Sequence, residues 1–409
     1  MELETGRLAQ KAGGSVLIKQ GDNVVLATVT MSNPREGLDF FPLTVDLEER
    51  HYAIGQIPGS FFRREGRPTT HAILTDRLID RPIRPLFPKG FKNEVQVIAT
   101  TLSSDREMPL DIIALNGVSA ALSISNIPFN GPIAATRIGH IDGEFVINPT
   151  YSQLEESLLD LVVAGSTDGV SMMEAGAKEL DEDVVFEAIQ LAQSVNLEVI
   201  SLQQDFIDES GIPKADFVPK GHDPEAVKQA RGILGDRIYT AMSDAEDQED
   251  MRNRLKFLED ELEESLAEEF DSSVSSGAFE ELLDEQFRVR ILKDGVRPDG
   301  RGLREIRPLS AEVSILPRTH GTGLFNRGET QILGITTLGS SGDAQKLDNL
   351  SPEVSKNFML HYNFPPYSVG EARRVGSTSR REIGHGALAE RALSAVLPSQ
   401  EDFPYTIRI

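Results

Sequence analysis

The chain has 409 residues, which is too long for one ordinary hydrophobic core and predicts two or three domains. Its 39% hydrophobic and 26% charged content is typical of a soluble globular protein, and no stretch approaches the roughly 18–20 apolar residues of a membrane span. The absence of cysteine excludes disulfides and thiolate metal sites, and it favours a cytoplasmic location.

The net charge of −24 argues against a polyanionic partner, but the charge is unevenly distributed. Residues 244–285 hold 17 Asp and Glu against three Arg and Lys. Because binding depends on the local field, positive patches can exist on an acidic protein. Arginines cluster in two other regions, at Arg63, Arg64, Arg67, Arg77, Arg81 and Arg84, and at Arg373, Arg374, Arg380 and Arg381.

The first part of the chain predicts a mixed α and β domain at residues 1–206. Residues 13–30 form two alternating strands around a Gly-Asp turn, which is typical of a β-hairpin. Further strands are expected at 93–99, 147–150 and 158–166. Residues 110–125 have small and apolar side chains with no charged stripe, which predicts a buried helix, and 179–206 predict an amphipathic helix.

A Gly- and Pro-containing linker is expected at 207–222, followed by an all-helical domain at 223–292. Its periodicity predicts three helices, at 223–242, 249–270 and 276–295. The acidic surface of this segment fits a solvated helical face, and a partner site is the alternative. The rest of the chain, 293–409, is predicted to be a third domain.

The third domain repeats the first. HGTGLFNRGETQILGITT (320–337) aligns with GGSVLIKQGDNVVLATVT (13–30), and PYTIRI (404–409) aligns with NEVQVIA (93–99). Each copy has an arginine loop between these two segments: GSFFRRE (59–65) in the first and GSTSRRE (376–382) in the second. Because the second copy stops where the first has reached about residue 99, we expect the chain to be a fragment with an incomplete second copy. The predicted fold class is α+β.

The first arginine loop carries Phe61, Phe62, Arg63 and Arg64. Guanidinium groups bind phosphate oxygens in a bidentate manner, and aromatic rings stack on unpaired bases, so the loop predicts binding of single-stranded RNA without sequence preference. Two alternatives remain: the phenylalanines lie in the core, or the arginines form salt bridges between domains.

The second loop is smaller and more polar, with Thr378 and Ser379 in place of the phenylalanines. Together with Arg380 and Arg381 it predicts a phosphate site. His385 follows, either to contact phosphate and transfer a proton or to make a structural hydrogen bond at a helix start. Glu65 and Glu382 are expected to orient the arginines, with metal binding as the alternative, and no zinc motif or Walker loop is present.

Several segments together closely resemble the bacterial polynucleotide phosphorylase (polyribonucleotide nucleotidyltransferase) family, and the match covers essentially the whole chain. They are IPGSFFRREGRP, LIDRPIRPLFPKGF, NEVQVIAT, IPFNGPIAA, LPRTHGTGLFNRGETQ, HYNFPPYSVGE and RREIGHGALAERAL. The resemblance implies two ribonuclease-PH-like domains, the second truncated here, joined by an all-α domain.

The resemblance also implies phosphate-dependent 3′-to-5′ degradation of mRNA with release of nucleoside diphosphates, and the reverse polymerisation. Inorganic phosphate is the implied co-substrate and Mg²⁺ or Mn²⁺ the implied metal. The implied assembly is a homotrimeric ring around single-stranded RNA, within an RNA-degrading complex and with no membrane contact. Phe61, Phe62, Arg63 and Arg64 would hold RNA, and Arg380, Arg381 and His385 would lie at the active site, with Thr378 and Ser379 near the phosphate.

The family's metal-binding aspartates, serine-rich phosphate loop and C-terminal RNA-binding domains would lie beyond Ile409, and its leading strand would precede residue 1. We therefore expect the metal site outside this chain and little activity from the chain alone. A non-catalytic RNA-binding ring of the same fold is the alternative function, and a hydrolytic nuclease is a third.

Overall fold

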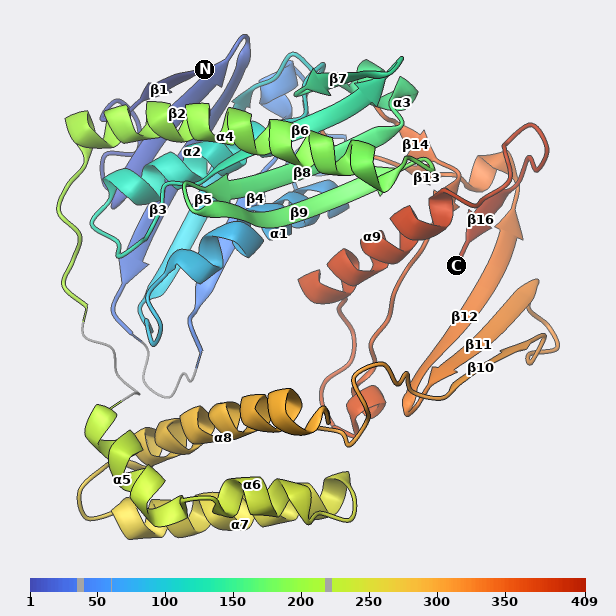
Figure 1. Ribbon diagram of the computed structural model, residues 1–409. Helices are drawn as coiled ribbons and strands as arrows, with labels where there is room; N and C mark the ends of the chain where they lie inside the picture. The colour runs from blue at the N-terminus through green and yellow to red at the C-terminus, as the bar shows by residue number, and fades with distance from the viewer. Residues whose placement is uncertain (35–39, 60, 218–222) are drawn as a thin grey trace.

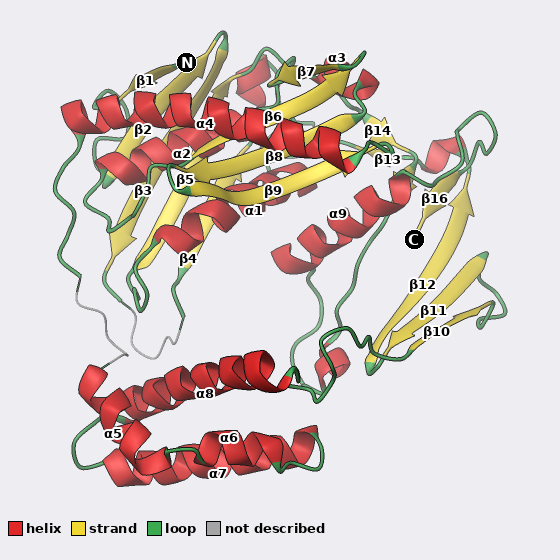
Figure 2. Cartoon of the chain, in the orientation of Figure 1, coloured by secondary structure: helices red, strands yellow, loops and turns green. Residues whose placement is uncertain are grey.

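The computed structural model describes residues 1–34, 40–59, 61–217 and 223–409 (Figure 1). Ser60 of the first arginine loop and residues 218–222 of the expected linker lie outside the described residues. The described chain forms a first unit of strands and helices, a helical unit and a second unit of strands and helices (Figure 2). None of the described helices has the length and apolar character needed to span a bilayer.

The first unit contains two sheets. The larger one is made of β1 (Glu2–Glu4), β2 (Gly14–Gln20), β3 (Asn23–Ser32), β4 (Leu43–Glu48) and β5 (Glu94–Ser103), in the order β1-β2-β3-β5-β4. The other is made of β6 (Ala134–Ile141), β7 (Glu144–Ile147), β8 (Leu159–Ser166) and β9 (Gly169–Ala177), in the order β7-β6-β8-β9.

Four α-helices and two 3₁₀ turns accompany these sheets among the described residues of the first unit. They are η1 (His51–Ile54), α1 (Thr70–Ile83), η2 (Arg84–Leu86), α2 (Asp111–Ile124), α3 (Tyr151–Glu156) and α4 (Glu182–Ser210). Helix α2 packs against β2 and β3 of one sheet and β6 of the other, and all of its residues are buried. The expected buried helix is confirmed, because a helix covered on every side has no place for a charged stripe.

The other expectations for the first unit need two adjustments. Helix α4 is present but continues to Ser210, beyond the expected domain end at 206. The strand expected at 147–150 is wrong: β7 ends at Ile147, and Thr150 instead caps the start of α3, where its side chain accepts a hydrogen bond from the Gln153 N–H. The strand expected at 158–166 is confirmed as β8.

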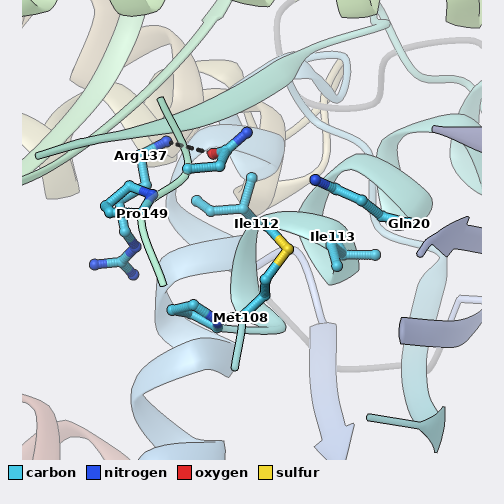
Figure 3. A pocket seen from close by; sticks show the side chains of 8 residues that line it. Gln20, Met108, Ile112, Ile113, Arg137 and Pro149 are labelled. Atoms are coloured by element: carbon cyan, nitrogen blue, oxygen red, sulfur yellow. Dashed lines mark hydrogen bonds between the residues drawn. The ribbon is translucent and has the colours of Figure 1, made fainter. Parts of the chain in front are cut away.

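A buried ion network lies beside α2. Arg137 of β6 pairs with Asp111 at the start of α2 and with Asp160 of β8. Its backbone N–H donates to the Asn148 side chain at 3.1 Å, the dashed line in Figure 3. The adjoining cavity, lined by Met108 and other mostly apolar residues, is only about 10 Å³. It holds at most one water molecule, so we assign it no ligand.

The helical unit consists of α5 (Pro224–Leu234), α6 (Arg237–Ser243), α7 (Gln248–Leu266) and α8 (Ser272–Asp294). Its buried side chains form a hydrophobic core of their own. The single helix expected at 223–242 is wrong, because Gly235 adopts a positive φ of 50° and breaks it into α5 and α6.

The second unit contains β10 (Leu309–Val313), β11 (Gly321–Arg327), β12 (Thr330–Gly339), η3 (Ser341–Asp343), β13 (Gln345–Lys346), β14 (Ser355–Lys356), β15 (Phe358–Met359), η4 (Pro366–Val369), α9 (Arg380–Ser394) and β16 (Thr406–Arg408). Its larger sheet has the order β10-β11-β12-β16-β15. This repeats the order of the first sheet, with β16 in the place of β5 and β15 in the place of β4.

The two hairpins also share their register. Gly14 pairs with Val29 in the first, and Gly321 pairs with Thr336 in the second, at the same positions of the aligned segments. The turn glycines, Gly21 and Gly328, have φ values of 59° and 58°. A positive φ at the first of two turn residues is the conformation that glycine supplies in type II′ hairpins. The internal repeat is therefore confirmed at the level of strand pairing.

The two sheets differ in what covers them. Val25 on β3 is fully buried, because α2 packs on this face, whereas its counterpart Ile332 on β12 is 49% exposed. The described part of the second unit has no helix in the position of α2.

This difference predicts opposite outcomes for one substitution at two equivalent glycines. A Cβ at Gly14 would overlap the Ala121 backbone oxygen of α2, whereas a Cβ at Gly321 would meet only Thr336 at 3.5 Å. Gly14→Ala should destabilise the first unit by about 1–3 kcal/mol, because α2 must shift. Gly321→Ala is the matched control and should stay within about 0.5 kcal/mol. Denaturant unfolding measures both, and equal effects would contradict the packing described.

Candidate active site

Helix α9 begins at Arg380 because its N-terminus is capped from both directions. The Ser379 hydroxyl accepts a hydrogen bond from the Glu382 N–H at 3.2 Å, and the Glu382 carboxylate accepts from the Ser379 N–H at 2.7 Å. Glu382 also accepts from the Phe364 N–H at 2.7 Å. These backbone hydrogen bonds hold the pKa of Glu382 below its usual value. Glu382 thus ties the segment before η4 to the start of α9.

A pocket of about 710 Å³ lies between that segment and the start of α9. The polar and charged part of its lining includes Arg373, Arg374, Thr378, Ser379, Arg381 and His385. Tyr362 and Phe364 supply aromatic surface, with their rings stacked at 6.3 Å. The His385 ring lies 4.4 Å from that of Tyr362.

The pocket brings together four of the five residues expected in the second loop: Thr378, Ser379, Arg381 and His385. Arg380 is directed elsewhere. It donates to the Val45 backbone oxygen of the first unit at 2.8 Å and pairs with Asp46. Arg380 thus forms a salt bridge between domains, the alternative that the sequence leaves open for the arginines of the first loop.

The electrostatics of the pocket favour an anion. The N-terminus of α9 carries the positive end of the helix dipole, and the Glu382 carboxylate, which also lines the pocket, already accepts the Ser379 N–H there. Three guanidinium groups line the same space, and arginine remains charged at any working pH. Arg373 and Arg374 are members of this set that the sequence-based site prediction missed, although their charge cluster was visible. Tyr362, Phe364 and Asn363 were missed as well, since no spacing rule places them beside α9.

The alignment of the two arginine loops is wrong in structural terms. Helix α1 has its N-cap at Thr69 and α9 at Ser379. Counted back from these caps, Arg63 and Arg64 occupy the places of Arg373 and Arg374. In each copy a 3₁₀ turn ends at a left-handed glycine, Gly55 in the first and Gly370 in the second. The stretch from this glycine to the N-cap is five residues longer in the first copy. A shared Gly-Ser-x-x-Arg-Arg-Glu string therefore falls on a loop in one unit and on a helix start in the other.

The first arginine loop is a projecting surface. Phe61 and Phe62 are 93% and 85% exposed and pack edge to face at 5.3 Å, so the alternative that they belong to the core is wrong. Arg63 has a left-handed φ of 51°. The base of the loop is held by Glu65, which accepts from the His51 N–H at 3.1 Å and lies 3.8 Å from Arg50.

The place in the first unit that corresponds to the pocket is closed. Its cavity has a volume of only about 10 Å³ and is lined by Leu47, Glu49 and His71. In the repeat, these residues take the positions of Tyr362, Phe364 and Arg381. Leu350 of the second unit lines the same cavity and is buried in the core of the first unit. The duplicated position is thus a contact between the units.

The polar groups at this closed position satisfy one another. Glu49 lies 2.9 Å from His71 and also accepts a hydrogen bond from Thr69. Burial opposes ionisation of Glu49, but the hydrogen bonds from His71 and Thr69 outweigh it and lower the Glu49 pKa. Burial likewise opposes the charged imidazole, and Glu49 outweighs it to raise the pKa of His71. Both shifts favour the ionised forms of the two groups, so Glu49 and His71 stabilise each other at this closed position.

The described residues contain no candidate metal site. Within residues 1–34, 40–59, 61–217 and 223–409 there is no group of three or more His, Asp or Glu side chains that could hold a metal ion. The described part of the pocket therefore offers arginines, a histidine and a helix N-terminus to an anion. Its carboxylate, Glu382, accepts two backbone N–H groups and is no donor set for Mg²⁺.

Two family models match the chain. The model described as 3′ exoribonuclease family, domain 1, matches residues 1–128 and again residues 305–409. The model described as 3′ exoribonuclease family, domain 2, matches residues 131–195. The double match of domain 1 agrees with the two sheets of identical strand order.

The chain is similar along its whole length to curated proteins named polyribonucleotide nucleotidyltransferase. It is 50% identical to that of Chloroflexus aurantiacus (strain ATCC 29366 / DSM 635 / J-10-fl), covering 100% of this chain and 55% of the relative. It is 50% identical to that of Heliobacterium modesticaldum and 48% identical to that of Halothermothrix orenii, of which it covers 58% and 60%. The chain thus spans little more than half the length of these relatives.

Among solved structures, rice (Oryza sativa) Rrp46 matches 51% of this chain and 92% of its own, with 18% sequence identity and a TM-score of 0.40.

Proposed function

The chain belongs to the 3′ exoribonuclease family, and from this premise we propose that it supplies the RNA-holding and phosphate-binding part of a polyribonucleotide nucleotidyltransferase. The observation that carries the proposal is the pocket at the start of α9, with three arginines, a histidine and a helix N-terminus around about 710 Å³. Two ribonuclease-PH-like units with the same strand order provide the frame.

In the proposed reaction, an oxygen of inorganic phosphate attacks the phosphorus of the last phosphodiester bond of an RNA strand. The bond from that phosphorus to the 3′ oxygen of the preceding nucleotide breaks, and this oxygen takes up a proton. The products are a nucleoside diphosphate and an RNA shorter by one nucleotide. Because two anions must meet, the reaction needs preorganised positive charge.

The pocket residues divide these tasks in our proposal. Arg381 and the α9 N-terminus, with Thr378 and Ser379, bind the inorganic phosphate. Arg373 and Arg374 hold the scissile phosphate, and His385 exchanges the proton with the leaving oxygen. The supporting observation is that all six residues line one pocket.

The first arginine loop is the proposed RNA-holding element. Phe61 and Phe62 would stack on bases, while Arg63 and Arg64 would bind backbone phosphates. The exposure of both phenylalanines supports this, because exposed adjacent phenylalanines are costly in water unless a partner covers them. Such contacts carry no base information, so sequence preference would be weak.

The resemblance implies Mg²⁺ or Mn²⁺, which would supply further charge neutralisation when bound. The described residues do not fit such a metal, and no step proposed for this chain runs through one. We further propose that the protein acts on mRNA in the cytoplasm, as a homotrimeric ring within an RNA-degrading complex. The absence of cysteine agrees with a reducing compartment.

The direct test of the pocket is a titration of the purified chain with inorganic phosphate. Calorimetry measures the binding, and the NMR signals of the histidine rings report which of them is affected. The chain has seven histidines, so the His385 signal can be assigned by substitution. The proposal expects saturable binding with a shift of the His385 signal. Absence of binding would remove its main support.

A further inference from the structure

Helix α9 presents two different stripes to two different surroundings. Successive residues of an α-helix are separated by about 100° around its axis, so the adjacent Arg380 and Arg381 cannot face the same way. Arg381 and His385 are four residues apart, share one face and line the pocket. Arg380 faces the first unit. The rotation of α9 about its axis therefore decides whether Arg381 and His385 reach the pocket.

The stripe that contains Arg380 meets the first unit at three positions along the helix, Arg380, Gly384 and Arg391. Gly384, one turn later, leaves room for Arg77 of α1, whose side chain would overlap a Cβ at that position. Near the end of α9, Arg391 pairs with Glu174 of β9 at 3.0 Å, and Glu174 also binds Arg81 of α1 at 2.7 Å. Figure 1 shows α9 lying along the first unit, on the side of α1 and β9.

At the start of α9 the contact is made by two carboxylates of the first unit. Arg380 pairs with Asp46 of β4 and lies 3.3 Å from Asp76 of α1. Asp76 is only 3% exposed, and its Oδ2 makes no hydrogen bond among the described residues but is the oxygen that lies 3.3 Å from the Arg380 guanidinium. The other accepts from the Leu47 N–H. Arg380 is therefore the charged partner of a buried carboxylate, and removing one member of such a pair leaves the other uncompensated.

From this arrangement we propose that Asp46 and Asp76 are positioning residues for the second unit's pocket: by holding Arg380 they fix the rotation of α9 that turns Arg381 and His385 toward the bound anion. The inference rests on the proposed function of the pocket and adds to it a part for the first unit. It also gives Arg380 a role different from that of Arg381, through contacts that join two units more than 300 residues apart in sequence.

Burial, together with the nearby carboxylates Asp46 and Glu49, raises the pKa of Asp76 to about 7, against the lowering effect of the Leu47 N–H and Arg380. The shift reports burial, which opposes the charged form of Asp76, while Arg380 favours it. The groups that face it come from β4, the segment after β4 and α9.

The test compares phosphate affinities of the chain and its variants by calorimetry. Asp46→Asn and Arg380→Met should each weaken phosphate binding about ten- to hundredfold, because small displacements of oriented groups have effects of that order. Their double variant should be no weaker than the single ones, since both remove the same constraint. Asp46→Glu, which keeps the charge, should recover part of the loss.

Arg391→Met is the matched control. It removes an ion pair between the same helix and the same unit, but near the other end of α9, and should leave phosphate affinity within about twofold. The NMR signal of His385 gives a second reading: in the Asp46→Asn and Asp76→Asn variants it should move before phosphate is added, and in Arg391→Met it should not.

Three outcomes would overturn the inference. If Arg380→Met weakens binding while Asp46→Asn and Asp76→Asn do not, Arg380 itself contacts the anion. If substitution of Arg380, Asp46 or Asp76 leaves the phosphate affinity unchanged while the unmodified chain binds phosphate, the first unit does not position the pocket. If the unmodified chain binds no phosphate, the proposed function fails and the inference with it, a result that the other two outcomes cannot imitate.

Discussion

Arg381→Ala is expected to weaken the binding of inorganic phosphate about a hundredfold or more. A guanidinium bound in a bidentate manner to phosphate makes two charge-assisted hydrogen bonds, each contributing about 1.5–3 kcal/mol. Arg381 lines the pocket at the N-terminus of α9, so its loss also reduces the positive potential there. In an active enzyme containing this chain, the phosphorolysis rate should fall by about 10²–10³.

Two variants frame this result. Arg381→Lys keeps the charge but loses the planar fork, and it should fall between the unmodified chain and Arg381→Ala. Arg327→Ala removes an exposed arginine from β11, away from the pocket lining, and should change phosphate affinity less than twofold. An Arg381→Ala variant that binds phosphate as well as Arg327→Ala does would show that the pocket is not the phosphate site.

Replacing the four residues of the projecting loop should have the second-largest effect, on RNA. Phe61→Ala and Phe62→Ala should each reduce the affinity for oligo(A) about tenfold or more, because a base stacked on an aromatic ring contributes about 1–3 kcal/mol. Arg63→Ala with Arg64→Ala should reduce the slope of log affinity against log salt by about 0.7 for each phosphate that is no longer neutralised.

Fluorescence anisotropy of labelled oligo(A) over a salt series measures both quantities. Phe186→Ala is the matched control, since Phe186 is also exposed but lies on α4. Its affinity and salt slope should equal those of the unmodified chain. A salt slope that survives removal of both arginines would mean that Arg63 and Arg64 serve structure, as the alternative interpretation of the sequence holds.

The parts of the fold that the sequence predicted are those encoded locally. The hairpin around Gly21 carries its own turn signal, and the copy around Gly328 repeats it, so both could be recognised before any packing was known. Helix α2 was recognisable from a run of small and apolar residues. The break at Gly235 was not, because glycine inside a periodic helical pattern is often tolerated.

The parts that the sequence could not predict depend on contacts between distant segments. Arg380 and Arg381 are the same residue type at adjacent positions, and only the docking of α9 on the first unit distinguishes them. Leu350 looks like any apolar residue, yet it is buried in the core of the other unit. Alignment of the helix N-caps, rather than of similar sequence motifs, shows that Arg373 and Arg374 are the counterparts of Arg63 and Arg64.

The central claim, a phosphorolytic function for this core, is tested most directly by product analysis. The chain is joined to the part of the Chloroflexus aurantiacus relative that lies outside the match, and the fusion is incubated with oligo(A), with and without inorganic phosphate and Mg²⁺. We predict nucleoside diphosphates only when both are present, and none from the chain alone. Nucleoside monophosphates formed without phosphate, or no product from the fusion while the intact relative is active, would contradict the account.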